Sequence, residues 1–203
     1  MARTFLILHG VNGSGLGHWQ TYLAQQLRGR GENVLYPELS GKEEPDREVW
    51  IKELREQLAL AGDPAELTVV CHSLSCILWM HHAHDRATPP VARLLLVSPP
   101  GPSIVRAFRP TFHPIPMDAG RLHAAAGQML LVCTNGDPRC PETAAECYGN
   151  ILGLETVLLP NEAAHINSAS GYGAWPAMAA LCLAPGIGAN LLQPGAGRNA
   201  TAR

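Results

Sequence analysis

A serine stands where a short apolar run meets a helical segment. The sequence reads Leu67-Thr-Val-Val-Cys71-His72-Ser73-Leu74-Ser75-Cys76-Ile77, so a buried strand is expected to end just before Ser73. A nucleophilic serine on a strand–turn–helix elbow needs small residues two positions before and after it. Cys71 and Ser75 stand where that pattern has glycine, and both are small. Ser73 is therefore a candidate nucleophile, although a helix N-cap is equally compatible with this segment alone.

An aspartate and a histidine follow two later apolar runs. Asp137 comes after Met129–Cys133, and His165 comes after Thr156–Leu159. The order serine, aspartate, histidine is the one in which α/β-hydrolases carry their catalytic triad. Alone, each residue would be interpreted as part of a turn or a solvated loop. Together they predict that Ser73 attacks an acyl carbonyl, that His165 moves the proton and that Asp137 orients the imidazole.

A glycine-rich turn, His9-Gly10-Val11-Asn12-Gly13-Ser14, follows the first apolar run. Acyl transfer requires two N–H donors for the tetrahedral oxyanion. We assign them to the backbone N–H groups of Val11, in this turn, and Leu74, after the serine. A phosphate-binding loop is the alternative, but the glycines at 13, 15 and 17 miss the dinucleotide spacing and no P-loop lysine follows.

Six short apolar runs alternate with helical segments. The expected strands are Thr4–Leu8, Val34–Tyr36, Leu67–Cys71, Arg93–Val97, Met129–Cys133 and Thr156–Leu159, and the expected helices are Trp19–Arg28, Arg47–Leu60, Ser75–Arg86, Pro141–Leu152 and Tyr172–Leu183. Continuous apolar runs are typical of strands that are buried on both faces. The pattern predicts an α/β fold, a three-layer α/β/α sandwich around a mostly parallel, doubly wound sheet of about six strands. We expect one domain over residues 1–193 and a disordered tail over 194–203.

A proline-rich segment, Ser98–Asp118, follows the fourth expected strand. Proline fixes φ and removes a backbone donor, so a long ordered loop is expected here, at the sheet edge where α/β proteins bind ligands. A tentative substrate pocket consists of Asn12 and the apolar members of this loop, Phe108, Phe112, Ile115 and Met117. A local hydrophobic plug is an equal alternative for the apolar residues.

The remaining histidines are assigned structural roles. His81, His82 and His84 follow the elbow on one helix, where a partly exposed surface is favoured over a metal site because no metal-binding motif is present. His72 is expected to be structural, and His18 is expected to anchor the first helix beneath the glycine-rich turn. No metal and no organic cofactor are predicted.

Composition excludes several classes of function. The chain has 203 residues and a formal net charge of -2, without a basic run, which argues against a nucleic-acid partner. No apolar stretch approaches a membrane span, and the run Phe5–Leu8 is too short for a secretory signal. The six cysteines form no CxxC pair, so free thiols in the cytoplasm are expected. The oligomeric state is not readable from the sequence.

Several motifs together resemble one family. They are His9-Gly10, Gly17-His18-Trp19-Gln20, His72-Ser73-Leu74, Asp137-Pro138, His165-Ile166-Asn167 and Ser170-Gly171-Tyr172-Gly173-Ala174-Trp175-Pro176. Over Phe5 to Leu183 the chain resembles the small serine-hydrolase family related to retinoblastoma-binding protein 9, which includes the bacterial YdeN-like proteins. The resemblance implies a minimal α/β-hydrolase without a separate cap domain and a triad of Ser73, Asp137 and His165.

The sequence departs from that family at three positions. Family members commonly carry Gly or Ala where Ser75 stands, and Gly where Ala163 and Ala164 stand. We expect the Ser75 hydroxyl to crowd the elbow or to compete for His165. Ala164 is expected to restrict the backbone before the histidine. Either change would lower activity without abolishing the fold.

The predicted activity is hydrolysis of an ester or amide through an acyl-enzyme, foremost by a carboxylesterase (EC 3.1 class) acting on a small-molecule acyl substrate. Two alternatives remain open. One is a non-catalytic binding module for a protein or ligand on a hydrolase fold. The other is a serine peptidase or amidase that acts on small peptides, and it shares the same triad.

Overall fold

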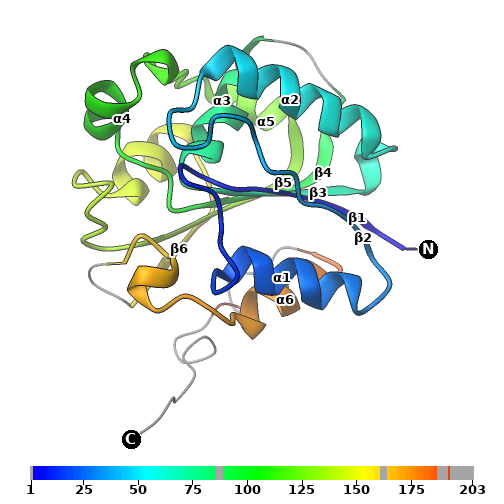
Figure 1. Ribbon diagram of the computed structural model, residues 1–203. Helices are drawn as coiled ribbons and strands as arrows, with labels where there is room; N and C mark the ends of the chain where they lie inside the picture. Colours follow the sequence, from blue (N-terminus) through cyan, green and yellow to red (C-terminus); the bar gives the residue numbers. More distant parts are fainter. Residues whose placement is uncertain (1, 86–88, 161–163, 187–191, 193–203) are drawn as a thin grey trace, which may run out of the picture.

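Six parallel strands form one sheet in the computed structural model, which describes residues 2–85, 89–160, 164–186 and 192 (Figure 1). The strands are β1 (Thr4–Leu8), β2 (Asn33–Leu35), β3 (Leu67–His72), β4 (Val91–Val97), β5 (Ala126–Thr134) and β6 (Thr156–Leu159). Their order across the sheet is β2-β1-β3-β4-β5-β6, and every neighbouring pair is parallel. The predicted α/β architecture is confirmed, and no separate cap domain is found among the described residues. The tail expected over 194–203 lies outside them.

Helices cover both faces of the sheet, as Figure 1 shows. On one face lie α1 (Trp19–Arg28) and α6 (Pro176–Leu183), and on the other lie α2 (Arg47–Leu60), α3 (Leu74–Asp85) and α5 (Ala119–Ala124). Each face has its own apolar core, because side chains alternate along each strand. Phe5 and Ile7 of β1 pack with α1 and α6, whereas Leu6 and Leu8 pack with α2 and α3. No helix in the described part of the chain is long and apolar enough to cross a membrane.

Four elements, β1, α1, α2 and β6, have the predicted bounds, and most boundaries of the other elements differ by one to three residues. The last helix begins at Pro176 instead of Tyr172 because proline occupies its first turn, where its missing N–H costs nothing. The helix expected over Pro141–Leu152 is present in shorter form, over residues 144–152, and its middle is the π-helical segment η3 (Ala145–Asn150). A short 3-10 turn, η1 (Pro64–Glu66), precedes β3, and another, η4 (Ser168–Ser170), follows the loop of His165.

The proline-rich segment is less irregular than the sequence predicts. It contains a short helix, α4 (Pro102–Phe108), and a 3-10 turn, η2 (Pro110–Phe112). Pro102 and Pro110 occupy the first turns of these elements, a position that proline favours. The prolines therefore begin short helices here instead of preventing them.

The chain reverses its winding direction beside β1. From β1 it passes through α1 to β2 on one side, and it then returns to β3 on the other side of β1. Because α1 and α3 cover opposite faces of the sheet, the connections that leave the carboxyl ends of β1 and β3 diverge. Open α/β sheets bind ligands in the crevice at such a switch point. The glycine-rich turn follows β1 and Ser73 follows β3, so both lie at this crevice.

Candidate active site

Ser73 occupies a sharp turn between β3 and α3. Its φ is +56°, a left-handed conformation that is uncommon for residues other than glycine. The Ser73 N–H donates to Val97 O of β4 at 2.9 Å, and Ser73 O accepts from Cys76 N at 3.0 Å. Backbone strain of this kind persists where surrounding contacts hold it, and it is frequent at functional sites. This geometry favours the elbow interpretation of Ser73 over a plain N-cap.

The three predicted triad residues lie together. His165 Nε2 is 2.8 Å from Ser73 Oγ, and His165 Nδ1 is 2.9 Å from Asp137 Oδ2 and 3.1 Å from Oδ1. A carboxylate oxygen only accepts, so the ring donates through Nδ1 and its Nε2 is free to accept the serine proton. The Asp137 side chain is 3 % exposed and the His165 side chain is 12 % exposed, so of these two residues the imidazole lies nearer to solvent. The geometry is that of a nucleophile, a base and an orienting acid.

The loop after β5 holds the aspartate in place. Gly136 has φ +73°, which turns the chain sharply before Asp137. Asp137 Oδ1 accepts from Arg139 N at 2.8 Å, and Asp137 O accepts from Cys140 N at 2.9 Å. Oδ1 of the carboxylate is therefore hydrogen-bonded within its own loop, and Oδ2 makes the shorter hydrogen bond to the histidine.

The loop of His165 is held by three successive carbonyls. Ala164 O accepts from Thr134 Oγ1, and His165 O accepts from His72 Nε2 at 3.1 Å. Ile166 O accepts from the indole N–H of Trp19 at 2.8 Å, and Ile166 itself has a left-handed backbone with φ +47°. Ala164 is buried beside the histidine, and the expectation that it restricts the backbone there stays a prediction. Ala163 lies outside the described residues.

Two buried histidines lie behind the triad. The ring of His72 lies 5.3 Å from that of His165 and 5.0 Å from that of His18, which also caps α1 through Nδ1. Burial, with a further contribution from His165, lowers the pKa of His72 well below its usual value and that of His18 to about 4. Both rings are therefore neutral near pH 7, which avoids extra positive charge beside the imidazole of His165. Sequence reasoning gave both residues structural roles and missed this direct contact.

The glycine-rich turn packs directly on the elbow. A Cβ on Gly10 would lie 2.7 Å from Ser73 Cβ, so only glycine fits. His9 is buried, donates from Nδ1 to Gly10 O at 2.7 Å and accepts at Nε2 from Leu39 N at 2.8 Å. Leu74 is the first residue of α3, so its N–H has no acceptor within the helix. Val11 and Leu74 thus lie on the two segments that border Ser73, as the oxyanion assignment requires.

Ser75 does not have the role that its sequence position suggested. Its side chain is fully buried, and its Oγ lies 2.8 Å from Leu8 O and 2.9 Å from His72 O. The same oxygen accepts from His72 N at 2.8 Å. The hydroxyl connects β1 to the elbow, so the expectation that it competes for His165 is wrong.

The tentative pocket residues do not form one group. Phe112 is fully buried in the core, where its ring packs against Trp50 and His81, so its assignment to a pocket wall is wrong. Ile115 is half-buried against the same core. Phe108 and Met117 are exposed. Asn12 has φ +66° and lines a hollow with Lys42 beside the glycine-rich turn. The plug interpretation therefore holds for Phe112.

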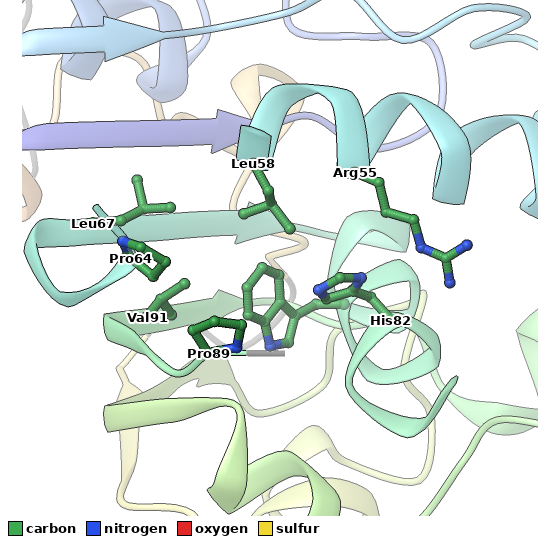
Figure 2. Close-up of a pocket in the computed structure, with 8 residues that line it drawn as sticks. Arg55, Leu58, Pro64, Leu67, His82, Pro89 and Val91 are labelled. Atoms are coloured by element: carbon green, nitrogen blue, oxygen red, sulfur yellow. The ribbon is translucent and has the colours of Figure 1, made fainter. Parts of the chain in front are cut away.

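The histidines of α3 differ from their predicted environment. His81 and His82 are buried, and His81 Nε2 lies 2.9 Å from Phe112 O, so a partly exposed surface is wrong for both. His82 borders a hollow of 290 Å³ whose walls include Leu67 and Val91 (Figure 2). Those residues begin β3 and β4, so this hollow lies at the amino ends of the strands. Ser73 lies at the opposite edge.

One further residue at the catalytic edge was not found from the sequence. Ser98 follows β4, which lies between the strands that carry Ser73 and Asp137. It is fully buried with φ +46°, and its Oγ has no hydrogen-bond partner within the described chain. A buried polar atom without a partner is unusual in proteins. In the sequence, a single serine before two prolines does not indicate a buried hydroxyl without a partner.

Known proteins share the sequence pattern and the fold of this chain. The family model described as "Serine hydrolase" matches residues 5–183. The ydeN gene product of B. subtilis has a similar structure (TM-score 0.76, 16% identity, covering 89% of this chain and 97% of that one). So does a putative YdeN-like hydrolase from Pectobacterium atrosepticum (TM-score 0.70, 21% identity, 88% of each chain).

A lower structural similarity extends to a further protein. Est1E from Butyrivibrio proteoclasticus matches with a TM-score of 0.62 and 14% identity, and 81% of each chain is covered. No curated protein matched the sequence. At these identities the structural matches establish the fold alone, whereas the family model covers most of the chain. The chain belongs to the serine hydrolase family.

Proposed function

We propose that this protein is a carboxylesterase-like hydrolase that cleaves a small acyl substrate through an acyl-enzyme on Ser73. The observation that carries the proposal is the hydrogen-bonded series Ser73 Oγ, His165 Nε2, His165 Nδ1 and Asp137 Oδ2. These hydrogen bonds, of 2.8 and 2.9 Å, support the proposal because they are short enough for proton transfer without prior rearrangement. The esterase folds among the similar structures support the same class of reaction.

The reaction proceeds in two halves. Ser73 Oγ attacks the acyl carbonyl carbon while His165 Nε2 takes the serine proton, and the N–H groups of Val11 and Leu74 receive the charge on the oxygen. His165 then gives that proton to the leaving group, and the acyl group stays on Ser73. Water, deprotonated by the same imidazole, attacks the acyl-enzyme and releases the acid. Asp137 holds the ring and stabilises its positive charge in both halves.

Free thiols are consistent with the expected cytoplasmic location. All six cysteines are unpaired, and five of them are buried. We propose that the enzyme works in a reducing compartment on a small-molecule substrate.

A fluorophosphonate probe and an ester panel test the nucleophile. Wild-type protein should be labelled and should hydrolyse short activated acyl esters, whereas Ser73→Ala should lose labelling and about 10⁶-fold in kcat. Ser40→Ala, at an exposed serine, is the matched control and should behave as wild type. Folded wild-type protein that neither reacts with the probe nor hydrolyses any substrate would support the non-catalytic binding module. Faster hydrolysis of aminoacyl amides than of esters would assign the peptidase class instead.

A further inference from the structure

The loop after Asp137 brings together three side chains that the proposed hydrolysis does not use. The Sγ atoms of Cys140 and Cys147 and a carboxylate oxygen of Glu142 all lie within 4.8 Å of one another. Cys140 is buried, Cys147 is half-buried and Glu142 is exposed. The cluster therefore has a closed side made by thiols and an open side toward solvent.

Two thiols and a carboxylate are ligands of soft and borderline divalent cations. In a tetrahedral zinc site, bonds of about 2.3 Å to sulfur and about 2.1 Å to oxygen separate neighbouring ligand atoms by about 3.5–3.8 Å. The spacing in the cluster is at most 4.8 Å, so a contraction of about 1 Å or less would close the site. We propose that Cys140, Glu142 and Cys147 bind a thiophilic divalent cation such as Zn²⁺, with water as the fourth ligand.

The backbone around the cluster favours this use. Gly101, after β4, faces it, and a Cβ on Gly101 would meet the Glu142 carboxylate and approach Cys140 Sγ to 3.4 Å. Gly101 N donates to Arg139 O at 2.7 Å, which joins the two loops at this point. The absence of a side chain on Gly101 therefore leaves room for the carboxylate beside the buried thiol.

The charges around the cluster also favour a cation. Glu142 belongs to the cluster, and Asp137 precedes Cys140 by three residues, so two carboxylates lie near the thiols. A divalent cation would compensate their negative charge. On binding, each thiol loses its proton to solvent and coordinates as thiolate, so affinity should increase with pH.

The cluster is structurally coupled to the triad but takes no part in its chemistry. Cys140 N donates to Asp137 O at 2.9 Å, so a cation on Cys140 would brace the turn that carries the catalytic acid. Asp137 itself keeps its oxygens on Arg139 N and His165. The expected consequence is a stabilised loop.

Cobalt binding tests the site without any measurement of turnover. Reduced, metal-free protein titrated with Co²⁺ should give a thiolate-to-cobalt charge-transfer band at a 1:1 ratio, and Zn²⁺ should remove it. Cys147→Ser should lose the band. Glu142→Gln, which changes an exposed side chain and does not threaten folding, should weaken Co²⁺ binding by about tenfold or more.

Matched variants control for general effects. Cys182→Ser removes a buried thiol on α6, Glu155→Gln removes an exposed carboxylate, and both should bind Co²⁺ as wild type does. Zn²⁺ should raise the melting temperature of wild type and of both controls but not that of Cys147→Ser. A wild type without the charge-transfer band, or a band that persists in Cys147→Ser, would overturn the proposal. Because the readouts are spectral and thermal, failure of the proposed esterase activity would leave them unaffected.

Discussion

The two sides of the site are held in place by different means. On the serine side, residues 71–76 and the turn at Gly10 are fixed by backbone conformation and close approach, with Ser73 at φ +56° and no room for a Cβ on Gly10. On the acid–base side, the loop of His165 is fixed by side-chain hydrogen bonds from distant elements, among them Trp19 and His72, whereas Asp137 is held within its own loop. The comparison indicates that the serine depends on close backbone packing, whereas the histidine depends on side-chain hydrogen bonds across the fold.

Among substitutions that leave the nucleophile in place, the largest effect is expected on the acid–base side. Asp137→Asn should lower kcat/KM by about 10⁴-fold, because the amide no longer enforces the ring tautomer that accepts the serine proton. Its melting temperature should change little, since the amide oxygen can still accept from Arg139 N. Steady-state kinetics with an activated ester and a thermal melt measure the two effects.

Asp63→Asn is the matched control for that substitution. Asp63 caps η1 at the opposite edge of the sheet, and asparagine caps equally well, so activity should stay at the wild-type level. An Asp137→Asn enzyme that keeps more than about a tenth of its activity would show that another group orients His165.

On the serine side, a single added methyl group should displace the nucleophile. In Gly10→Ala the new Cβ would lie 2.7 Å from Ser73 Cβ and 3.2 Å from His72 O, so the elbow must move. A displacement of about 1 Å at a nucleophile costs on the order of 100-fold in rate, and strain of this kind costs about 1–3 kcal/mol of stability. The measurements are kcat/KM and the free energy of unfolding in urea.

Gly15→Ala provides the comparison in the same loop. A Cβ there meets nothing within 4 Å, so both quantities should stay near wild type. Equal kinetics for the two alanine variants would contradict a nucleophile positioned by close approach.

The same contrast explains which features the sequence predicted. The sheet, the elbow and the order of the triad follow from local patterns, namely apolar runs, small residues around Ser73 and polar residues after strands. Three successive carbonyls fix the His165 loop through donors that lie up to 147 residues away, and no local pattern records them. Phe112 was placed in a pocket because its segment follows a strand, but its own ring is drawn into the core by Trp50 and His81.

A buried hydroxyl tests how far the serine side depends on backbone contacts. Ser75→Ala should lose about 1–3 kcal/mol of stability, because the buried His72 N loses its acceptor, whereas Leu8 O keeps the hydrogen bond from Gln20 Nε2. Activity should fall by less than about tenfold, since neither group contacts substrate. Ser40→Ala, on the surface, should change stability by less than about 0.5 kcal/mol. Unchanged stability with higher activity in Ser75→Ala would instead mean that the hydroxyl crowds Ser73.

The smallest expected effect concerns pH and the histidines behind the triad. Burial lowers the pKa of His18 from 6.5 to about 4, so the unfolded chain binds more protons than the folded one between these values. This contribution to stability is fully present above pH 6.5 and is lost as the pH falls toward 4. At one pH unit below 6.5, His18 alone lowers the stability by on the order of 1 kcal/mol, and His72 adds to this loss in the same direction.

The variant His18→Asn isolates that contribution. Asparagine can still cap α1 at this position, where His18 Nδ1 accepts from Gln20 N at 3.2 Å, but it does not titrate. Urea unfolding at pH 7.5 and 5.5 should therefore show a smaller loss of stability in the variant than in wild type, and the difference should persist in 0.5 M salt because buried groups are weakly screened. Identical losses in the two proteins would mean that His18 is protonated in the folded state, and the buried imidazoles would then add positive charge behind His165 instead of avoiding it.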